Sequence, residues 1–267
     1  MLKTGFIGGG NMAFAMVGGL VKGGVLPPED ILVSDLSPCA RSALEQAFAV
    51  KTSTDNRALA QMARFIVLAV KPQQYQSIID EIKDVVLADK QKVVITIAPG
   101  WTLARLESAF GGPLKLVRTM PNTPALVGEG MSAACKNELV TPDEMEQVVS
   151  LIGSYGRVEV VPEALFDAFT ALCACSPAFV FMMIEAMADA AVREGFARDQ
   201  AYALVSQAVL GSARMVLETG KHPAQLKDMV CSPGGSTIEG VCALEESGFR
   251  AAIFQAIERA ASKNREL

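Results

Sequence analysis

A Pro-Gly-Gly-Ser-Thr turn joins two apolar, helix-forming runs within the segment from Leu226 to Leu244. Pro233 ends the first run, because proline has no N–H and disfavours helix at the residue before it. Gly234-Gly235 allows positive φ, and Ser236 and Thr237 then stand where an N-cap would begin the next helix. A turn of this kind points several N–H groups and a helix dipole at one spot, which suits a carboxylate. A plain helix–helix corner is the alternative interpretation.

A second chemical motif stands at the start of the chain, where Gly8, Gly10 and Ala13 form G-x-G-x-x-A. A strand pattern over Leu2–Ile7 precedes it, and a helix pattern reaches to about Lys22. Gly8 permits the tight turn, Gly10 lets a pyrophosphate approach the backbone, and Ala13 lets the helix pack on the strand. The position between strand and helix predicts dinucleotide binding.

The second predicted strand, residues 31–34, ends where a cofactor's adenosine ribose would lie. Asp35 is placed to hold a ribose 2′-hydroxyl, which would favour NAD. Ser34, Ser37 and Arg41 could instead hold a 2′-phosphate, and the local sequence leaves both cofactors open. Ser37 and Pro38 are expected to start the helix after this strand as cap and first-turn proline, and Asp55 or Asn56 to cap the short helix that follows.

Three further apolar runs predict central strands of a parallel sheet: residues 65–69, 93–97 and 114–118. Each ends in a loop rich in proline and glycine or polar residues, at 70–72, 98–100 and 120–124. Open α/β sheets bind ligands outside these carboxyl ends, so we expect the loops to line one crevice. Lys71 follows a sheet strand at this edge, which favours a role in cofactor binding over a merely solvent-exposed side chain. Trp101 could flank a cofactor or cap a hydrophobic loop.

Beyond two weaker strands and the capping box Thr141-Pro142-Asp143-Glu144, the pattern changes at Pro162. The rest reads as helices, several of them apolar on most faces, which other helices or a second subunit must cover. Residues 169–184 are apolar but contain Pro177 and are short for a membrane span, so we interpret them as a buried helix. The predicted helices cover residues 164–172, 178–194, 198–219, 223–230, 238–246 and 249–262.

Composition argues against several classes of function and partner. A net charge of −5 with no basic cluster argues against nucleic acid as a partner. Six cysteines without paired spacing and a single histidine make a metal site hard to build, and they fit free thiols in the cytoplasm. We interpret His222, before Pro223, as a helix-start residue, with a catalytic acid as the alternative. The N-terminal apolar stretch lacks the features of a signal peptide.

Four segments together resemble the pyrroline-5-carboxylate reductase family: GFIGGGNMAFAM at the start, AVKP at 69–72, MPNTPALV at 120–127 and LKDMVCSPGGSTIEGV at 226–241. The similarity runs along nearly the whole chain, and the Ser-Pro-Gly-Gly-Ser-Thr stretch is its most specific motif. It implies an α/β fold with an N-terminal Rossmann-type dinucleotide-binding domain, residues 1–162, followed by an all-α dimerisation domain, residues 163–267. It also implies NADPH-linked reduction of 1-pyrroline-5-carboxylate to L-proline, with NADH usable, by a homodimer that often assembles into a decamer.

The resemblance also implies roles for individual positions. Thr237 is the catalytic candidate. The substrate-binding candidates are Glu163, Ser176, Gly234, Gly235, Ser236 and Thr237. The cofactor-binding candidates are Gly8, Gly10, Asn11, Met12, Ser34, Asn56, Ala69, Val70, Lys71, Pro72, Ala98, Pro99 and Gly100.

One departure from the family pattern precedes the long apolar helix. The family has Ser-Gly-Ser before a Ser/Gly-Pro-Ala-Tyr sequence, whereas this chain has Cys173-Ala174-Cys175 followed by Ser176-Pro177-Ala178-Phe179. Thiols therefore stand where the family has two hydroxyls next to the expected substrate pocket.

Two other functions compete with the reductase. A dehydrogenase of the β-hydroxyacid type would need a lysine in the helical domain, and the Ser-Pro-Gly-Gly-Ser-Thr turn argues against it. A non-enzymatic NADP-binding sensor would not need that turn at all. Hydride transfer to an imine requires alignment of two rings and a held carboxylate, with no metal or covalent nucleophile.

Overall fold

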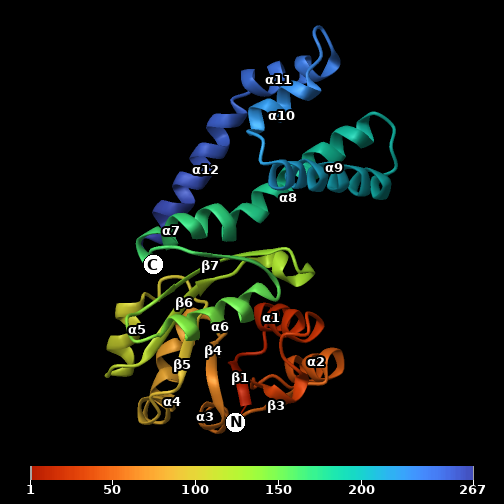
Figure 1. Cartoon of the computed structure of the whole chain (residues 1–267). Coiled ribbons are helices and arrows are strands. Elements are labelled where there is room, and N and C mark those ends of the chain that lie inside the picture. Colours follow the sequence, from red (N-terminus) through yellow and green to blue (C-terminus); the bar gives the residue numbers. More distant parts are fainter. Residues whose placement is uncertain (1, 267) are drawn as a thin grey trace. The chain divides into compact units, whose positions relative to one another are not determined.

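The computed structural model describes residues 2–266 and divides into two compact units (Figure 1). The first unit extends to Cys175 and also contains the end of the chain from Ala260, and the second is Ser176–Arg259. The predicted domain boundary at residues 162–163 lies earlier in the chain, before a short helical segment that stays with the first unit.

The first unit is built on one eight-stranded sheet with the order β3-β2-β1-β4-β5-β6-β7-β8. Neighbouring strands are parallel except for the antiparallel pair β6 and β7. The first six strands therefore have the Rossmann order, with a topological switch point between β1 and β4. The strands are β1 (Leu2–Ile7), β2 (Ile31–Ser34), β3 (Lys51–Ser53), β4 (Ala63–Leu68), β5 (Val93–Thr96), β6 (Lys115–Met120), β7 (Gly130–Lys136) and β8 (Gly156–Val160).

Helices cover both faces of this sheet (Figure 1). Helices α1, α2 and α6 pack on one apolar cluster, and α3, α4 and α5 pack on the other. Alternate residues of a central strand reach opposite faces, so Phe65 and Val67 enter the first cluster while Ile66 and Leu68 enter the second. These helices are α1 (Asn11–Lys22), α2 (Pro38–Phe48), α3 (Asn56–Met62), α4 (Tyr75–Ala88), α5 (Leu103–Phe110) and α6 (Pro142–Gly153).

Local signals predicted most of these elements. Ser37 caps α2, Asp55 caps α3, and Thr141 with Glu144 forms the predicted capping box of α6. The three-residue strand β3 was not predicted, because Lys51-Thr52-Ser53 has no apolar alternation and forms only by pairing with β2.

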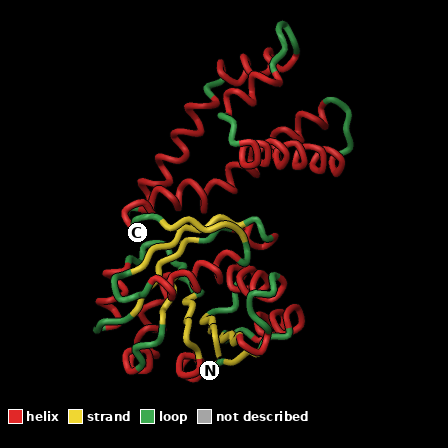
Figure 2. The backbone as a smooth tube through the Cα atoms, in the orientation of Figure 1, coloured by secondary structure: helices red, strands yellow, loops and turns green. Residues whose placement is uncertain are grey.

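The second unit is helical, and Figure 2 shows helix and connecting loops in that part of the tube. The helices after the sheet are α7 (Phe166–Phe169), α8 (Ser176–Arg193), α9 (Arg198–Thr219), α10 (Pro223–Val230), α11 (Ser236–Glu246) and α12 (Phe249–Asn264). Five of them, α8 to α12, match predicted helices to within about two residues at each end, which is the usual uncertainty of helix ends.

The predicted helix over 164–172 is wrong in detail. The chain forms a 3₁₀ turn, Glu163–Leu165, then α7, then a π-helical segment, Thr170–Cys175. Pro177 has no N–H to offer the carbonyl of Cys173, and that carbonyl instead accepts a hydrogen bond from Asn122 Nδ2 at 2.9 Å. The widened turn is the local consequence of that missing bond.

The prediction that residues 169–184 form a buried helix also needs correction. Within the described chain, Ala188 is the single buried residue of α8, and Met182 is 68% exposed. By length and composition alone, Glu163–Arg193 is the one stretch among residues 2–266 that could cross a membrane. An apolar helix left open in one chain requires a cover from outside that chain.

Candidate active site

The glycine-rich loop between β1 and α1 has the conformation its sequence predicts. Gly8 has φ of +104°, and a Cβ there would stand 2.6 Å from the Ala69 carbonyl oxygen, so glycine is required. Gly10 is the N-cap of α1, and a Cβ on it would meet no described atom within 4 Å. No described side chain caps α1. Open space in front of uncapped N–H groups leaves room for a pyrophosphate, and the contacts of Gly8, Gly10, Asn11 and Met12 with it stay a prediction.

Asp35 fastens this loop from the end of β2. One carboxylate oxygen accepts the Gly9 N–H at 2.6 Å, and the other accepts the Ser37 N–H at 2.7 Å. Arg41 donates to the Asp35 carbonyl at 2.6 Å. Both carboxylate oxygens thus have backbone partners, which reduces their availability to a ribose hydroxyl. The guanidinium of Arg41 is the cation at this strand end.

Ser34 and Asn56, the predicted contacts of the adenosine end, are bonded to each other. The buried Ser34 hydroxyl donates to Asn56 Oδ1 at 2.8 Å, and Asn56 Nδ2 donates to Glu81 Oε2 at 2.8 Å. The chain of bonds fixes the start of α3 against the end of β2. It leaves the hydroxyl oxygen of Ser34 as an acceptor.

Tyr75 joins the ends of β4 and β5, and sequence reasoning missed it. Its hydroxyl donates to the Leu68 carbonyl at 2.6 Å and accepts from Thr96 Oγ1 at 2.9 Å. Burial raises the pKa of Tyr75 to about 12, so the phenol stays protonated and keeps donating. The two predicted cofactor loops, at 69–72 and 98–100, both start from strand ends held by this one hydroxyl. A lone tyrosine after a Lys-Pro pair carries no sequence signal for this role.

Trp101 ties the same two loops together further out. Its indole N–H donates to the Pro72 carbonyl at 3.2 Å, and its ring lies 5.0 Å from that of Tyr75. Arg105 lies over the Trp101 ring at 4.3 Å and donates to the Gly100 carbonyl at 2.9 Å. Trp101 is therefore a buried residue that packs between the two loops, which agrees with the interpretation of it as the cap of a hydrophobic loop. The side chain of Lys71 is exposed at this edge.

Glu163 stands at the start of the 3₁₀ turn after β8. Its Oε1 accepts the Leu103 N–H at 2.8 Å and a bond from Arg118 Nη1 at 3.0 Å. The carboxylate proposed as a substrate contact therefore has two protein partners.

The Ser-Pro-Gly-Gly-Ser-Thr turn lies in the second unit. Gly234 has φ of +68°, and the Gly235 N–H closes the turn on the Ser232 carbonyl at 3.1 Å. Gly235, with extended φ of −83°, is the N-cap of α11, which corrects the prediction that Ser236 or Thr237 would occupy that position. Both hydroxyl residues belong to the first turn and are exposed. In the described chain no side chain caps α11, so its first N–H groups have no capping side chain as a partner.

The substituted segment before α8 is half-buried at Cys173, Cys175 and Ser176. Burial raises the pKa of the Cys173 thiol, which keeps it protonated near neutral pH. His222 is the N-cap of α10, where its Nδ1 accepts the Ala224 N–H at 3.2 Å, in agreement with the helix-start interpretation.

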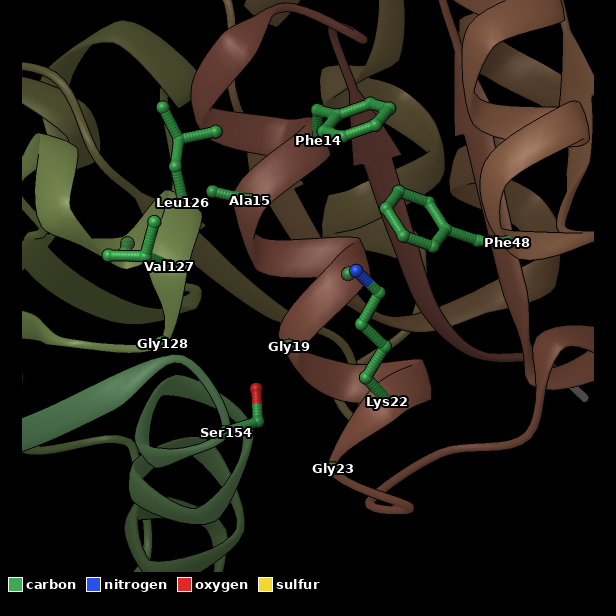
Figure 3. Close-up of a pocket in the computed structure, with 12 residues that line it drawn as sticks. Phe14, Ala15, Gly19, Lys22, Gly23, Phe48, Leu126, Val127, Gly128 and Ser154 are labelled. Carbon is green, nitrogen blue, oxygen red and sulfur yellow. The ribbon is translucent and has the colours of Figure 1, made fainter. Parts of the chain in front are cut away.

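A cavity of about 360 Å³ lies beside α1, but it is separate from the glycine-rich loop. Figure 3 shows its wall formed by Phe14 and Phe48, with Leu126, Val127 and Lys22 around it. Its lining runs along α1 from Phe14 to the C-cap Gly23, whereas the glycine-rich loop and the uncapped N–H groups precede Phe14. The part of the chain that the structure describes contains no group of three His, Cys, Asp or Glu side chains that could hold a metal ion.

A Rossmann sheet with a glycine-rich loop at the start of α1, in a chain that continues into a helical unit with an uncapped Gly-Gly-Ser-Thr turn, defines a dinucleotide-linked oxidoreductase of the two-domain class. Family models agree with both parts. Residues 3–100 match the model described as NADP oxidoreductase, coenzyme F420-dependent, and residues 163–267 match pyrroline-5-carboxylate reductase dimerisation.

The chain belongs to the pyrroline-5-carboxylate reductase family. It is 46% identical to the pyrroline-5-carboxylate reductase of Escherichia coli K12 over 265 residues, which cover 99% of this chain and 98% of that protein. It is 42% identical to the reductase of Methanosarcina acetivorans, covering 99% and 97%. The solved reductase structure from Coxiella burnetii has a TM-score of 0.92 at 36% identity, covering 99% and 97%. The Plasmodium falciparum enzyme, solved with NADP bound, has a TM-score of 0.89 at 32% identity, covering 99% and 97%.

Proposed function

We propose that this chain reduces the C=N bond of 1-pyrroline-5-carboxylate with NADPH and forms L-proline, the last step of proline biosynthesis. The observation that carries the proposal is the uncapped turn at Gly234–Thr237, within a chain that aligns end to end with reductases of this name. Full-length identity of 46% disfavours the β-hydroxyacid dehydrogenase alternative, and the intact turn disfavours the non-catalytic sensor.

The first unit supplies the cofactor site. Gly8, Gly10, Asn11 and Met12 receive the pyrophosphate at the start of α1, and Ser34 and Asn56 contact the adenosine end. NADPH, when bound, supplies the hydride from its nicotinamide ring. The loops that flank the cofactor contain Ala69, Val70, Lys71, Pro72, Ala98, Pro99 and Gly100.

The second unit supplies the substrate carboxylate site. The first-turn N–H groups of α11 and the helix dipole stabilise the carboxylate, and the positive φ of Gly234 makes the turn that leads into this uncapped helix start. Ser236 and Thr237 contribute these first-turn N–H groups, Gly234 and Gly235 shape the turn that leads into them, and Ser176 lies at the half-buried start of α8. The Thr237 hydroxyl orients the ring nitrogen while its basicity changes during reduction. A threonine hydroxyl is too weak an acid to be the only source of the proton.

The decisive experiment is a steady-state assay of Thr237→Ala with 1-pyrroline-5-carboxylate. Loss of one oriented hydrogen-bonding group is expected to lower the rate by about 10²- to 10³-fold, with NADPH binding retained. Because Gly235 and not Thr237 is the N-cap, this variant should keep the parent's Tm.

Thr237→Ser is the matched control, since it keeps the hydroxyl and should recover most of the activity. Turnover of the alanine variant within about twofold of the parent would remove Thr237 from the reaction, because an oriented group of this kind contributes far more.

We propose that NADPH is preferred over NADH. Asp35 uses both carboxylate oxygens on backbone N–H groups, and Arg41, together with Ser37, is available to a 2′-phosphate. Arg41→Ala should lower kcat/KM with NADPH by about tenfold while leaving that with NADH nearly unchanged, because a charge-assisted hydrogen bond contributes about 1.5–3 kcal/mol. A parent enzyme that works better with NADH would contradict the preference.

We further propose a cytoplasmic homodimer, formed through the helical region, that associates into a decamer, with neither nucleic acid nor a membrane as partner. The exposed apolar side chains of α8, α9 and α12 support dimerisation, and the match of residues 163–267 to a dimerisation domain names the same region. Sedimentation velocity at micromolar concentration tests this assembly, and a stable folded monomer there would contradict it.

A further inference from the structure

The carboxylate of Glu163 fastens a loop that is distant in sequence. Leu103, whose N–H it accepts at 2.8 Å, is the first residue of α5 and lies 60 positions earlier in the chain. Thr102 is the N-cap of that helix, and its hydroxyl accepts the Arg105 N–H at 3.1 Å. Thr102 and Glu163 therefore satisfy two separate first-turn N–H groups, and the negative charge is favourable at that end of the helix.

Arg118 holds Glu163 in place. It lies on β6 with only 3% of its surface exposed, and its guanidinium stacks over the buried Phe166 ring at 4.6 Å. Its Nη1 donates to the same Glu163 oxygen at 3.0 Å, while within residues 2–266 its Nε has no hydrogen-bond partner. A buried cation with a free donor depends on its one carboxylate for compensation.

Cys135 lies near Glu163 and Arg118, but its thiol is not a second anion for Arg118. Burial, together with the charge of Glu163, raises the pKa of its thiol to about 12. The thiol is therefore neutral near pH 7, and Glu163 is the anion that faces Arg118.

The loop that Glu163 fastens is the one between β5 and α5. Its inner end is held by the Ala98 N–H on Thr96 Oγ1 at 3.3 Å, and its middle by the Trp101 indole on the Pro72 carbonyl. The bond from Leu103 to Glu163 is the fastening at its outer end. Loss of that bond would leave the loop, which contains Ala98–Gly100 assigned to the nicotinamide side, held only at its inner end and middle.

We propose that Glu163 is a positioning residue, anchored by Arg118, that fixes the Ala98–Thr102 loop for the cofactor and does not bind the substrate. The inference rests on the proposed function for the assignment of that loop to the nicotinamide. It replaces the substrate contact that family resemblance implied for Glu163.

Trp101 gives a direct readout, because it is the only tryptophan in the chain and lies in the loop with 4% of its surface exposed. In Glu163→Ala, Trp101 emission should shift to longer wavelength and acrylamide quenching should increase. Loss of a hydrogen bond to a charged group should raise the Kd and KM for NADPH by about tenfold, with a smaller change in the KM for the imine substrate. Glu163→Gln keeps an oxygen for the Leu103 N–H and should recover most of the NADPH affinity.

Leu103→Pro separates the loop contact from the ion pair. Proline is favoured at the first helical position, and Thr102 already has the extended ψ of 162° that a following proline needs. This variant removes the N–H that Glu163 accepts and also the Leu103 side chain, which packs against two apolar clusters, so Leu103→Ala is its side-chain control. Relative to Leu103→Ala, it should reproduce the effects of Glu163→Ala on Trp101 and NADPH. Glu138→Gln, at an exposed carboxylate of the same unit, is the matched control and should match the parent.

Unchanged Trp101 emission and NADPH affinity in Glu163→Ala, together with a raised KM for the imine, would overturn the proposal and return Glu163 to the substrate. Failure of Leu103→Pro to affect NADPH would also overturn it. If the parent bound NADPH but did not reduce 1-pyrroline-5-carboxylate, the proposed function would fail while the fluorescence and NADPH results still decided the role of Glu163.

Discussion

The two units bury their apolar side chains in different ways. The sheet unit packs two continuous clusters, one on each face, and Phe65 at the centre of β4 is fully buried. In the helical unit the buried apolar residues among those described are Ala188, Ala201 and Val205, while Phe254 on α12 is 78% exposed. The first unit completes its core within one chain. The second has apolar helices whose cover must come from another copy, consistent with the dimerisation domain matched at 163–267.

Truncation of a core aromatic residue in the sheet unit should have the largest effect. Phe65→Ala leaves a cavity that neighbouring strands and helices cannot close, at an expected cost of about 3–5 kcal/mol in the free energy of unfolding. Thermal melts at several protein concentrations would measure it. The drop in Tm should be similar at each concentration, and a drop that disappeared at high concentration would mean that the sheet unit is not self-sufficient.

The matching truncation in the helical unit should act on assembly. Phe254→Ala removes an aromatic side chain that a single chain leaves exposed, so it should raise the dimer dissociation constant. A central interface residue contributes about 2 kcal/mol or more, which is roughly 30-fold in that constant. Sedimentation equilibrium checks this.

Leu139→Ala, at a half-exposed apolar side chain of the sheet unit, is the control and should leave the dimer unchanged. Equal dimer strength in Phe254→Ala and the parent would mean that α12 lies outside the interface.

A smaller effect should appear with pH in the sheet unit. Burial alone would raise the pKa of Glu144, but Lys115 Nζ at 2.6 Å and the Thr141 N–H at 3.0 Å outweigh it and hold that pKa below its usual 4.5. A depressed pKa in the folded state means that the carboxylate stabilises the fold above about pH 4.5 and loses this contribution as the pH falls through the folded pKa.

Melts of Glu144→Gln and the parent from pH 7 to pH 3 test the sign of this effect. The parent should be the more stable at pH 7, and the difference should narrow on acidification. A difference that grew towards low pH would contradict the assignment.

Sequence patterns that act over a few residues determined much of this protein. The glycine-rich loop, the caps at Ser37 and Asp55 and the capping box at Thr141 all formed as predicted. The reason is that a missing proline N–H, a glycine with positive φ or a capping hydroxyl needs only neighbours within one turn. The Gly-Gly turn followed the same rule, although the cap moved to Gly235.

The tertiary structure alone decided which groups hold the site together. Asp35 meets Gly9 across 26 positions, and Glu163 meets Leu103 across 60. Both contacts depend on which strands become neighbours, and no local pattern specifies that order. The exposure of α8 was likewise not predictable from its apolar sequence, because the same residues suit a helix covered by its own chain or by another. Residues within one turn determined the loops and helix ends, whereas the order of strands in the sheet determined which backbone groups Asp35 and Glu163 contact.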